Sequence, residues 1–148
     1  MYKIIKKELL APNIYRMDIA APRVACSAKP GQFIILRLDE KGERIPLTIA
    51  DYDAAEGWVT IVTQTVGYST TKLCAMNPGD ELADFAGPLG RPSDFVHEDI
   101  ETLRSRKILF IAGGVGTAPV YPQVKWLSQH GIKADVIIGA KNKDTLIF

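Results

Sequence analysis

A glycine-rich segment between an apolar run and a helical pattern sets the tightest limit on the fold of this chain. The run Lys107–Ala112 is continuously apolar after its lysine, which is typical of a parallel strand buried on both faces. Gly113–Pro119 follows, and Ala118–His130 then has apolar residues at helical spacing before Gly131, a typical helix end. Ala134–Ile138 predicts a second buried strand. We therefore expect one βαβ unit in this region.

The first half of the chain has short apolar segments near period two, rich in Ile, Val, Thr and Tyr and separated by Pro- and Gly-containing turns. This pattern is typical of antiparallel strands that can close a small barrel. The expected strands are Tyr2–Leu10, Ile14–Ala20, Gln32–Leu38, Leu47–Tyr52, Trp58–Thr65 and Glu81–Phe85, with one short helix at Ser69–Met76. The predicted fold is a six-stranded antiparallel β-barrel over residues 1–100, followed by a partial α/β domain over residues 101–148.

Charge and composition exclude several classes of function. The chain has 18 basic and 17 acidic residues, so no long-range field favours nucleic acid or an anionic membrane. Cys26 and Cys74 lack the paired spacing of zinc or iron–sulfur ligands, so we predict free thiols and no metal site. Charged residues interrupt the apolar ones near the N-terminus, and no run reaches membrane-spanning length. A cytoplasmic, unsecreted protein is expected.

The glycine segment has the position and composition of a ligand-binding loop. Glycines there let backbone N–H groups approach a ligand, and the helix that follows offers unpaired donors and a positive dipole end to a pyrophosphate. Pro119 stands where the third glycine of the common dinucleotide-binding pattern would be, so the loop is not an ordinary member of that class. The alternative is a tight strand-to-helix turn without a ligand.

Two further segments have residues suited to a phosphate. Arg44 stands just before a predicted strand and can hold a phosphate with two hydrogen bonds, while Thr48 can offer a hydroxyl to a ring nitrogen. An arginine at a strand start is also commonly a solvated surface residue. Val66–Thr71 places a glycine and the hydroxyls of Ser69, Thr70 and Thr71 at a helix start, which suits a phosphate but equally suits plain helix capping.

Together these segments resemble the ferredoxin–NADP reductase superfamily, whose members join an FAD-binding barrel to a nucleotide-binding α/β domain. The chain looks most like the alpha subunit of NADH-dependent ferredoxin–NADP reductase, and next like the electron-transfer subunit of dihydroorotate dehydrogenase. Arg44-Ile45-Pro46-Leu47-Thr48 matches the Arg-x-Tyr/Pro-x-Ser/Thr element of the family. The resemblance implies that Arg44 meets the FAD pyrophosphate and that Thr48 lies beside the flavin ring near N5. The implied FAD-binding residues are Arg44, Pro46, Leu47, Thr48, Gly67, Ser69 and Thr70.

The same resemblance assigns the glycine segment to NAD(P)H. The implied residues are Gly113, Gly114, Gly116, Thr117 and Pro119, which match the Gly-Gly-x-Gly-x-Ala/Thr-Pro loop of the family. Gly139–Asn142 resembles a following Gly-Ala-Arg element, but Lys141 replaces the arginine, so NADP is not inferred over NAD. Gly87–Gly90 matches a loop between the two domains of the family, and its ordinary interpretation is an interdomain turn.

The implied function is FAD-dependent electron transfer between NAD(P)H and an iron–sulfur protein or partner subunit. The flavin does the chemistry, so no acid–base residue is needed, and Thr48 is the residue expected nearest the reacting atom. The implied partners are a larger flavoprotein subunit and ferredoxin or another electron carrier. The alternatives are the dihydroorotate dehydrogenase electron-transfer subunit and a non-catalytic barrel that only contacts other proteins.

The family's nucleotide domain has more strands and helices than this chain provides, and an iron–sulfur cluster belongs to a cysteine-rich C-terminal segment that this sequence lacks. We therefore expect a shortened form that ends at Phe148. Such a form is expected to bind FAD weakly or not at all, and pyridine nucleotide more weakly still, so the chain itself is expected to show little activity.

Overall fold

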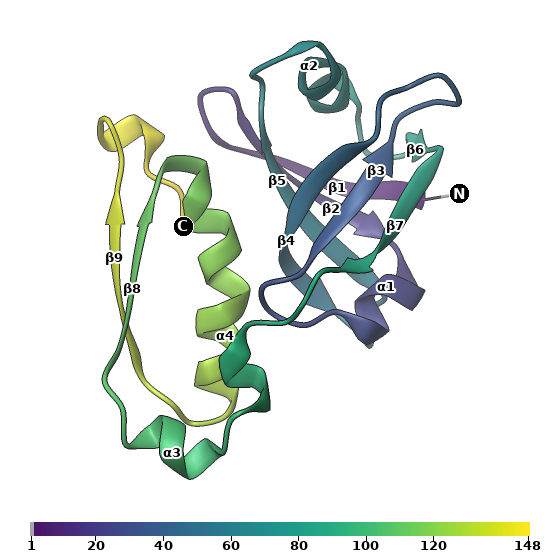
Figure 1. Cartoon of the computed structure of the whole chain (residues 1–148). Coiled ribbons are helices and arrows are strands. Elements are labelled where there is room, and N and C mark those ends of the chain that lie inside the picture. Colours follow the sequence, from purple (N-terminus) through teal and green to yellow (C-terminus); the bar gives the residue numbers. More distant parts are fainter. Residues whose placement is uncertain (1) are drawn as a thin grey trace.

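The computed structural model describes residues 2–148, and the part up to residue 89 consists mainly of antiparallel strands (Figure 1). We call residues 2–89 the barrel. Its elements are β1 (Tyr2–Ala11), β2 (Ile14–Ala20), α1 (Pro22–Ser27), β3 (Phe33–Arg37), β4 (Ile45–Asp53), β5 (Trp58–Gln64), α2 (Tyr68–Ala75), β6 (Glu81–Leu82) and β7 (Asp84–Leu89). The strands form one sheet in the order β6-β1-β2-β5-β4-β3-β7.

The two end strands of this sheet nearly close it into a barrel. β6 pairs with β1, β7 pairs with β3, and only Ala83 separates β6 from β7 along the chain. The segment predicted as one strand, Glu81–Phe85, therefore divides between two strands that pair at opposite ends of the sheet. The prediction of an antiparallel barrel followed by a partial α/β region is confirmed, with seven strands in the sheet in place of six.

The barrel interior follows from the alternation of apolar residues along its strands. Ile4, Met17, Ile19, Ile34 and Leu36 have no exposed surface. Met17 faces Ile61 across the β2–β5 pair, so these side chains meet in the middle of the sheet. Burial of residues of this size stabilises the fold by about 1.5–3 kcal/mol each.

A short helix that the sequence pattern did not predict covers part of the same core. α1 buries Val24 and Ala25, and its first residue is Pro22, whose fixed φ suits a helix start. Six residues are too few for a helical period to show in the sequence, which is why the segment did not read as a helix. The only available signal was Pro22 at the start, with Val24 and Ala25 two and three residues later.

The remaining residues form a smaller region that we call the α/β part, residues 94–148. Its elements are η1 (Asp94–His97), α3 (Ile100–Arg104), β8 (Ile108–Gly113), η2 (Gly114–Val120), α4 (Tyr121–Gln129), β9 (Ala134–Gly139) and η3 (Lys143–Thr145). β8 and β9 pair in parallel from Ile108↔Ala134 to Gly113↔Gly139. The predicted strand–helix–strand unit is present, but a 3₁₀ turn fills the residues before Tyr121, where the α-helix was expected to have begun.

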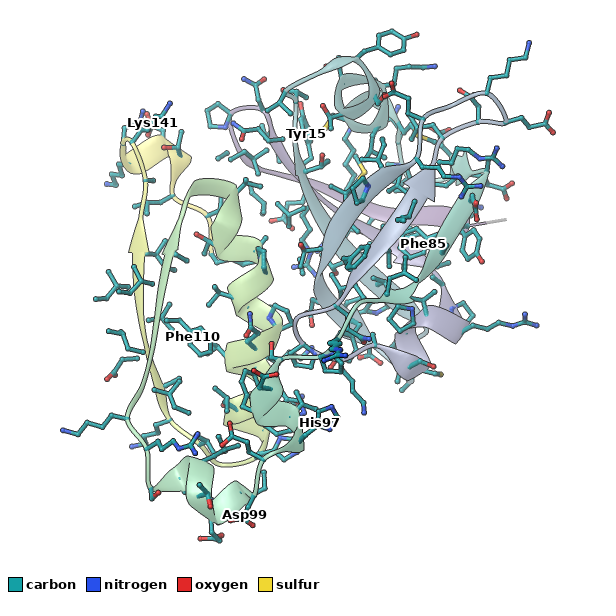
Figure 2. The ribbon with its side chains drawn as sticks, in the orientation of Figure 1. Tyr15, Phe85, His97, Asp99, Phe110 and Lys141 are labelled. Atoms are coloured by element: carbon teal, nitrogen blue, oxygen red, sulfur yellow. The ribbon has the colours of Figure 1, made fainter. Side chains whose placement is uncertain are left out.

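The β8–β9 pair is covered on one face, because α4 lies between it and the barrel (Figure 1). Phe110 lies on the α4 side, in a cluster with Leu127 (Figure 2). On the other face Leu109, Ile111 and Ile137 are 53%, 73% and 55% exposed. The expectation that both strands are buried on both faces is therefore wrong for this chain, since one helix can cover only one side of the pair.

The two regions meet through an apolar cluster, an ion pair, and a hydrogen bond from Ser93 Oγ, in the segment that joins them, to Gln123 of α4 at 2.9 Å. Ala118 of η2 packs with Ala50 and Val62 of the barrel, and Ile147 joins the same cluster. Lys125 of α4 pairs with Asp51 of β4 at 2.7 Å. No helix among residues 2–148 has the length and apolar character that a membrane span requires.

Candidate functional site

The glycine loop opens toward solvent at the end of β8. Gly114 has a φ of 54°, a left-handed conformation that favours glycine. A Cβ atom added at Gly114 or Gly116 would meet no heavy atom within 4 Å, so the backbone at both positions is free to approach another molecule. This is the geometry expected of a loop that brings its N–H groups close to a phosphate.

A cavity of about 510 Å³ lies against this loop and has walls from both regions of the molecule. The α/β wall is the loop itself and the residues that follow β9, including Lys141, which lies beyond the end of that strand (Figure 2). The barrel wall is formed by Ile14 and Gln64, which face each other across β2 and β5. The complete lining is Ile14, Gln64, Gly113, Gly114, Val115, Gly139, Ala140, Lys141 and Thr145.

Three residues predicted in the loop, Gly116, Thr117 and Pro119, do not line this cavity. Thr117 is only 3% exposed, and its hydroxyl has no hydrogen-bond partner among the described residues. It lies in the wall of a separate apolar hollow with Tyr121, Val136 and Phe148. The carbonyl of Pro119 accepts a hydrogen bond from Gln123 Nε2 at 3.0 Å. Thr117 and Pro119 therefore contribute to the conformation of the loop and do not face the cavity.

The arginine segment lies at the start of β4, as its sequence position implied. The Arg44 side chain is 62% exposed, and its Nη1 donates to Asp84 at 3.1 Å. A guanidinium has five N–H donors, so most of them are left for an anion. Pro46 is exposed, Leu47 and Thr48 are half-buried, and Thr48 pairs with β3.

The start of α2 has both a helix-capping hydrogen bond network and open space that suits a phosphate. The Thr70 hydroxyl accepts from the backbone N–H groups of Val66 and Gly67 at 3.1 and 3.0 Å, which is a capping role. A Cβ added at Gly67 would meet nothing within 4 Å, so the space beside the helix start is open. The first N–H groups of a helix have no acceptor within it, and the dipole there favours an anion.

The fold brings the arginine segment and the start of α2 together. The Ser69 hydroxyl donates to the Glu43 carboxylate, which joins the residue before Arg44 to α2. Lys72 and Asp39 make a second link at 3.4 Å. Hydrogen bonds from the Lys41 backbone and from Lys72 hold the pKa of Asp39 below its usual value, and the Asp39 carboxylate raises the pKa of Lys72.

The donor set at this junction fits a diphosphate such as that of FAD. Arg44 supplies a guanidinium and α2 supplies free backbone N–H groups, so both charge and direction suit an anion. Asp84 and Glu43 are the groups that a phosphate would replace as partners of Arg44 and Ser69. Both carboxylates border the site, and each weakens its attraction for an anion.

Sequence reasoning missed five residues of these sites: Ile14, Gln64, Thr145, Glu43 and Asp84. Glu43 was detectable only as a neighbour of Arg44, and a glutamate in a charged loop usually reads as solvated. Gln64 and Asp84 had no signal, because each reaches its site through pairing between strands that are far apart in sequence.

Comparison with known proteins adds evidence for the family. No family model matches the chain. It is 66% identical over all 148 residues to a Clostridium beijerinckii protein described as "Uncharacterized protein in adh 3'region", of which it covers 50%. It is 41% identical over 145 residues to the Thermotoga maritima "Dihydroorotate dehydrogenase B (NAD(+)), electron transfer subunit homolog", covering 98% of this chain and 49% of that protein.

A solved structure of an NADH-dependent reduced ferredoxin–NADP oxidoreductase is 39% identical and matches with a TM-score of 0.89, covering 100% of this chain and 51% of that one. Phthalate dioxygenase reductase, at 16% identity and a TM-score of 0.77, shares the fold. The chain thus spans about half the length of the curated relatives it matches. In its barrel, its glycine loop and its similarity to the Thermotoga maritima protein and to the NADH-dependent oxidoreductase, the chain resembles members of the ferredoxin–NADP reductase superfamily.

Proposed function

We propose that this chain binds FAD on its barrel and NAD(P)H at its glycine loop, and takes part in electron transfer from NAD(P)H to an iron–sulfur protein or partner subunit. The observation that carries the proposal is the shared cavity beside the glycine loop. Its walls come from the ends of β2 and β5 on one side and from β8 and β9 on the other. Two redox groups held by the two regions would therefore face each other across one space.

On the barrel, Arg44 and the backbone N–H groups of α2 would hold the diphosphate of FAD. Pro46 and Leu47 continue β4 from there, and they lead to Thr48, whose hydroxyl we assign to the ring system near N5. Gly67 leaves room for the diphosphate because it lacks a side chain. Ser69 and Thr70 would complete the cradle, with Ser69 exchanging its Glu43 partner for a phosphate oxygen.

At the glycine loop, Gly113, Gly114 and Gly116 would present backbone N–H groups to the pyridine nucleotide. Lys141 borders the same cavity and supplies a cation for a phosphate of that nucleotide. Thr117 and Pro119 would act by holding the loop in shape, because both lie behind its open face.

Bound FAD supplies the redox chemistry, since a flavin can take a hydride from NAD(P)H and pass on single electrons. The residues of this chain bind and orient the two cofactors and exclude water between them. No side chain has to move a proton for this, because the hydride and the electrons pass between the cofactors themselves.

Two physiological roles have support. The likeness to the NADH-dependent ferredoxin–NADP oxidoreductase favours an alpha subunit that works with a larger flavoprotein and ferredoxin or another carrier. The 41% identity to the Thermotoga maritima protein favours the second role, that of an electron-transfer subunit for dihydroorotate dehydrogenase. Both roles require the same two cofactors.

The test is an absorbance spectrum of the purified chain with added FAD, followed by anaerobic addition of NADH and then NADPH. We expect flavin bands near about 375 and 450 nm to shift on binding and to bleach with reduced nucleotide. Desalting then measures how tightly the flavin is held. A chain that neither perturbs the FAD spectrum nor quenches its fluorescence at high protein concentration contradicts the proposal and favours a barrel that only contacts proteins.

A further inference from the structure

β4 is the strand through which the barrel meets the α/β part, and a bulge makes this contact possible. The register of β4 against β5 shifts between Ile49 and Asp51. Ile49 faces the barrel core and the next residue, Ala50, packs outside it with Ala118 of the glycine loop. The extra residue then places Asp51 opposite Thr60, on the outer face as well. A bulge is a common way to redirect a side chain in this manner.

Asp51, the residue after the bulge, is held by a cation from the other region. Its carboxylate accepts from Lys125 Nζ at 2.7 Å and from the backbone N–H of Tyr52 at 2.8 Å. Lys125 Nζ also donates to the Tyr52 carbonyl at 3.4 Å. Asp51 is only 7% exposed, so solvent screens this ion pair much less than a surface pair.

The neighbouring charges leave Lys125 as the counter-ion of Asp51. Across the sheet Asp51 lies opposite Thr60, whose hydroxyl donates to Asp18 at 2.6 Å. Asp18 is itself paired with Arg16 of its own strand at 3.2 Å. Two buried carboxylates thus lie on either side of Thr60, and the cation for one of them comes from α4.

The ion pair and the apolar cluster touch the α/β part at two different places. The cluster holds η2 through Ala118, whereas Lys125 lies further along α4. Between the β4–β5 turn and α4 a groove of about 300 Å³ remains open, lined by Tyr52, Asp53, Trp126 and others. Packing does not fill this groove, so α4 is held beside the barrel by the cluster at Ala118, by a hydrogen bond from Ser93 Oγ to Gln123 Oε1 at 2.9 Å, and by the Lys125 ion pair.

We propose that Lys125 is a positioning residue, which through its ion pair with Asp51 fixes the glycine loop relative to β4. The pair joins the two elements that carry the proposed cofactor contacts. Thr48 lies three residues before Asp51 on β4, and the glycine loop runs directly into α4. Loss of the pair would widen the range of distances between the two cofactors without removing any residue that touches them.

The first test measures the two regions without any cofactor. Spin labels would be placed at Lys3→Cys on β1 and Ser105→Cys after α3, both exposed positions, in a Cys26→Ser background. Pulsed dipolar spectroscopy then reports the distribution of distances between them. We expect a narrow distribution for the unaltered pair, a broad one for Lys125→Met, and a narrow one again for Lys125→Arg, which restores the charge.

Two further variants keep this test decisive. The double variant Asp51→Asn/Lys125→Met leaves no lone buried charge, so it should fold and still give the broad distribution. Lys6→Met removes a cation from an exposed pair within β1 and should leave the distribution narrow. An unchanged width in both Lys125→Met and the double variant would overturn the proposal, as would a broad distribution in Lys125→Arg.

The second test rests on the proposed function and compares rates with affinities. With FAD bound, Lys125→Met should slow flavin reduction by saturating NADH by up to about 100-fold, since small errors in placement cost that much. The affinity for FAD alone should stay within about twofold, because Lys125 lies away from Arg44 and α2. Equal rates in the variant and the unaltered chain would overturn the proposal, whereas no reduction in either would contradict the proposed function and leave the distance result standing.

Discussion

The barrel and the α/β part differ in how completely they bury their apolar residues. Inside the barrel Ile4, Met17 and Ile34 have no exposed surface, whereas Ile111 of β8 is 73% exposed and Ile137 of β9 is 55% exposed. Both regions use the same kinds of side chain. The difference is that a nearly closed sheet covers itself, while a parallel pair depends on helices packed against each face.

The two regions also differ in the size of their apolar cores, on which their stability depends. The barrel core is one continuous cluster drawn from most of its strands, and the rings of Phe85 and Tyr2 pack against each other at a tilt with their centroids 5.5 Å apart. The α/β core is a small group around Leu103, Leu127 and Ile132. We therefore expect the barrel to be the more stable unit and the α/β part to open first.

The largest expected effect is the difference between a buried position of the barrel and an exposed position of β8. Phe85→Ala should lower the free energy of unfolding by about 3–5 kcal/mol, because it leaves a cavity in a filled core. Ile111→Ala removes a side chain that is already mostly in water, so its cost should be within about 0.5 kcal/mol. Urea unfolding measures both.

The two tryptophans make this measurement specific to each region, since Trp58 lies in β5 and Trp126 in α4. A Trp58→Phe background reports on the α/β part, and a Trp126→Phe background reports on the barrel. Equal costs for Phe85→Ala and Ile111→Ala would refute the contrast between the two regions.

The next effect tests whether the barrel alone carries the flavin site. Arg44→Ala should weaken FAD binding by about 1.5–3 kcal/mol, because it removes charge-assisted hydrogen bonds to the diphosphate. Fluorescence titration of FAD gives the affinity, and Arg23→Ala, at an exposed position on α1, is the matched control. If both variants bind FAD equally well, the diphosphate does not lie at Arg44.

A pair of glycine substitutions tests the α/β part in the same way. Gly114→Ala should cost about 1–2 kcal/mol, because its φ of 54° is unfavourable for alanine. Gly116 has no positive φ and equally open surroundings, so Gly116→Ala should cost less than about 0.5 kcal/mol. Thermal unfolding followed through Trp126 compares them, and the reverse order would mean that the loop conformation differs from the one described.

A smaller effect concerns the acidic residue beside the flavin site. Glu43→Gln removes a negative charge near the proposed diphosphate, so FAD binding should strengthen by up to about 1 kcal/mol. Glu56→Gln, in the exposed turn between β4 and β5, serves as the control and should change nothing. Weaker binding in Glu43→Gln would show that Glu43 supports the site through Ser69.

The smallest effect is a pH dependence in the α/β part. Hydrogen bonds from the Thr102 backbone and hydroxyl hold the pKa of Asp99, the cap of α3, below its usual value. A lowered folded-state pKa means that this contribution is present above the usual pKa and is lost as the pH falls through the lowered one. Asp99→Asn keeps a capping oxygen but cannot titrate, so the α/β part of the variant should lose less stability between about pH 5 and pH 2. Identical acid profiles would contradict this role.

Much of the fold was readable from local pattern. Alternating apolar residues marked the strands of the barrel, and the run before Gly113 marked β8, because each pattern reflects the repeat of its own element. Arg44, Gly67 and the glycine loop could be proposed as phosphate-binding segments from the sequence alone, since the residues that suggest this chemistry are consecutive, and the proposal remains a prediction. The short helix α1 was not readable from the sequence, because six residues show no period.

The remaining features depend on which distant segments come into contact, and only the tertiary structure decided them. Ala83 separates two strands because their partners, β1 and β3, lie at opposite ends of the sheet. The contacts of Glu43 with Ser69 and of Lys125 with Asp51 join residues 26 and 74 positions apart. From the sequence alone a charged side chain is expected to be solvated, because only the tertiary structure shows its partner. Lys125 becomes a contact between the two regions because its partner, Asp51, is buried.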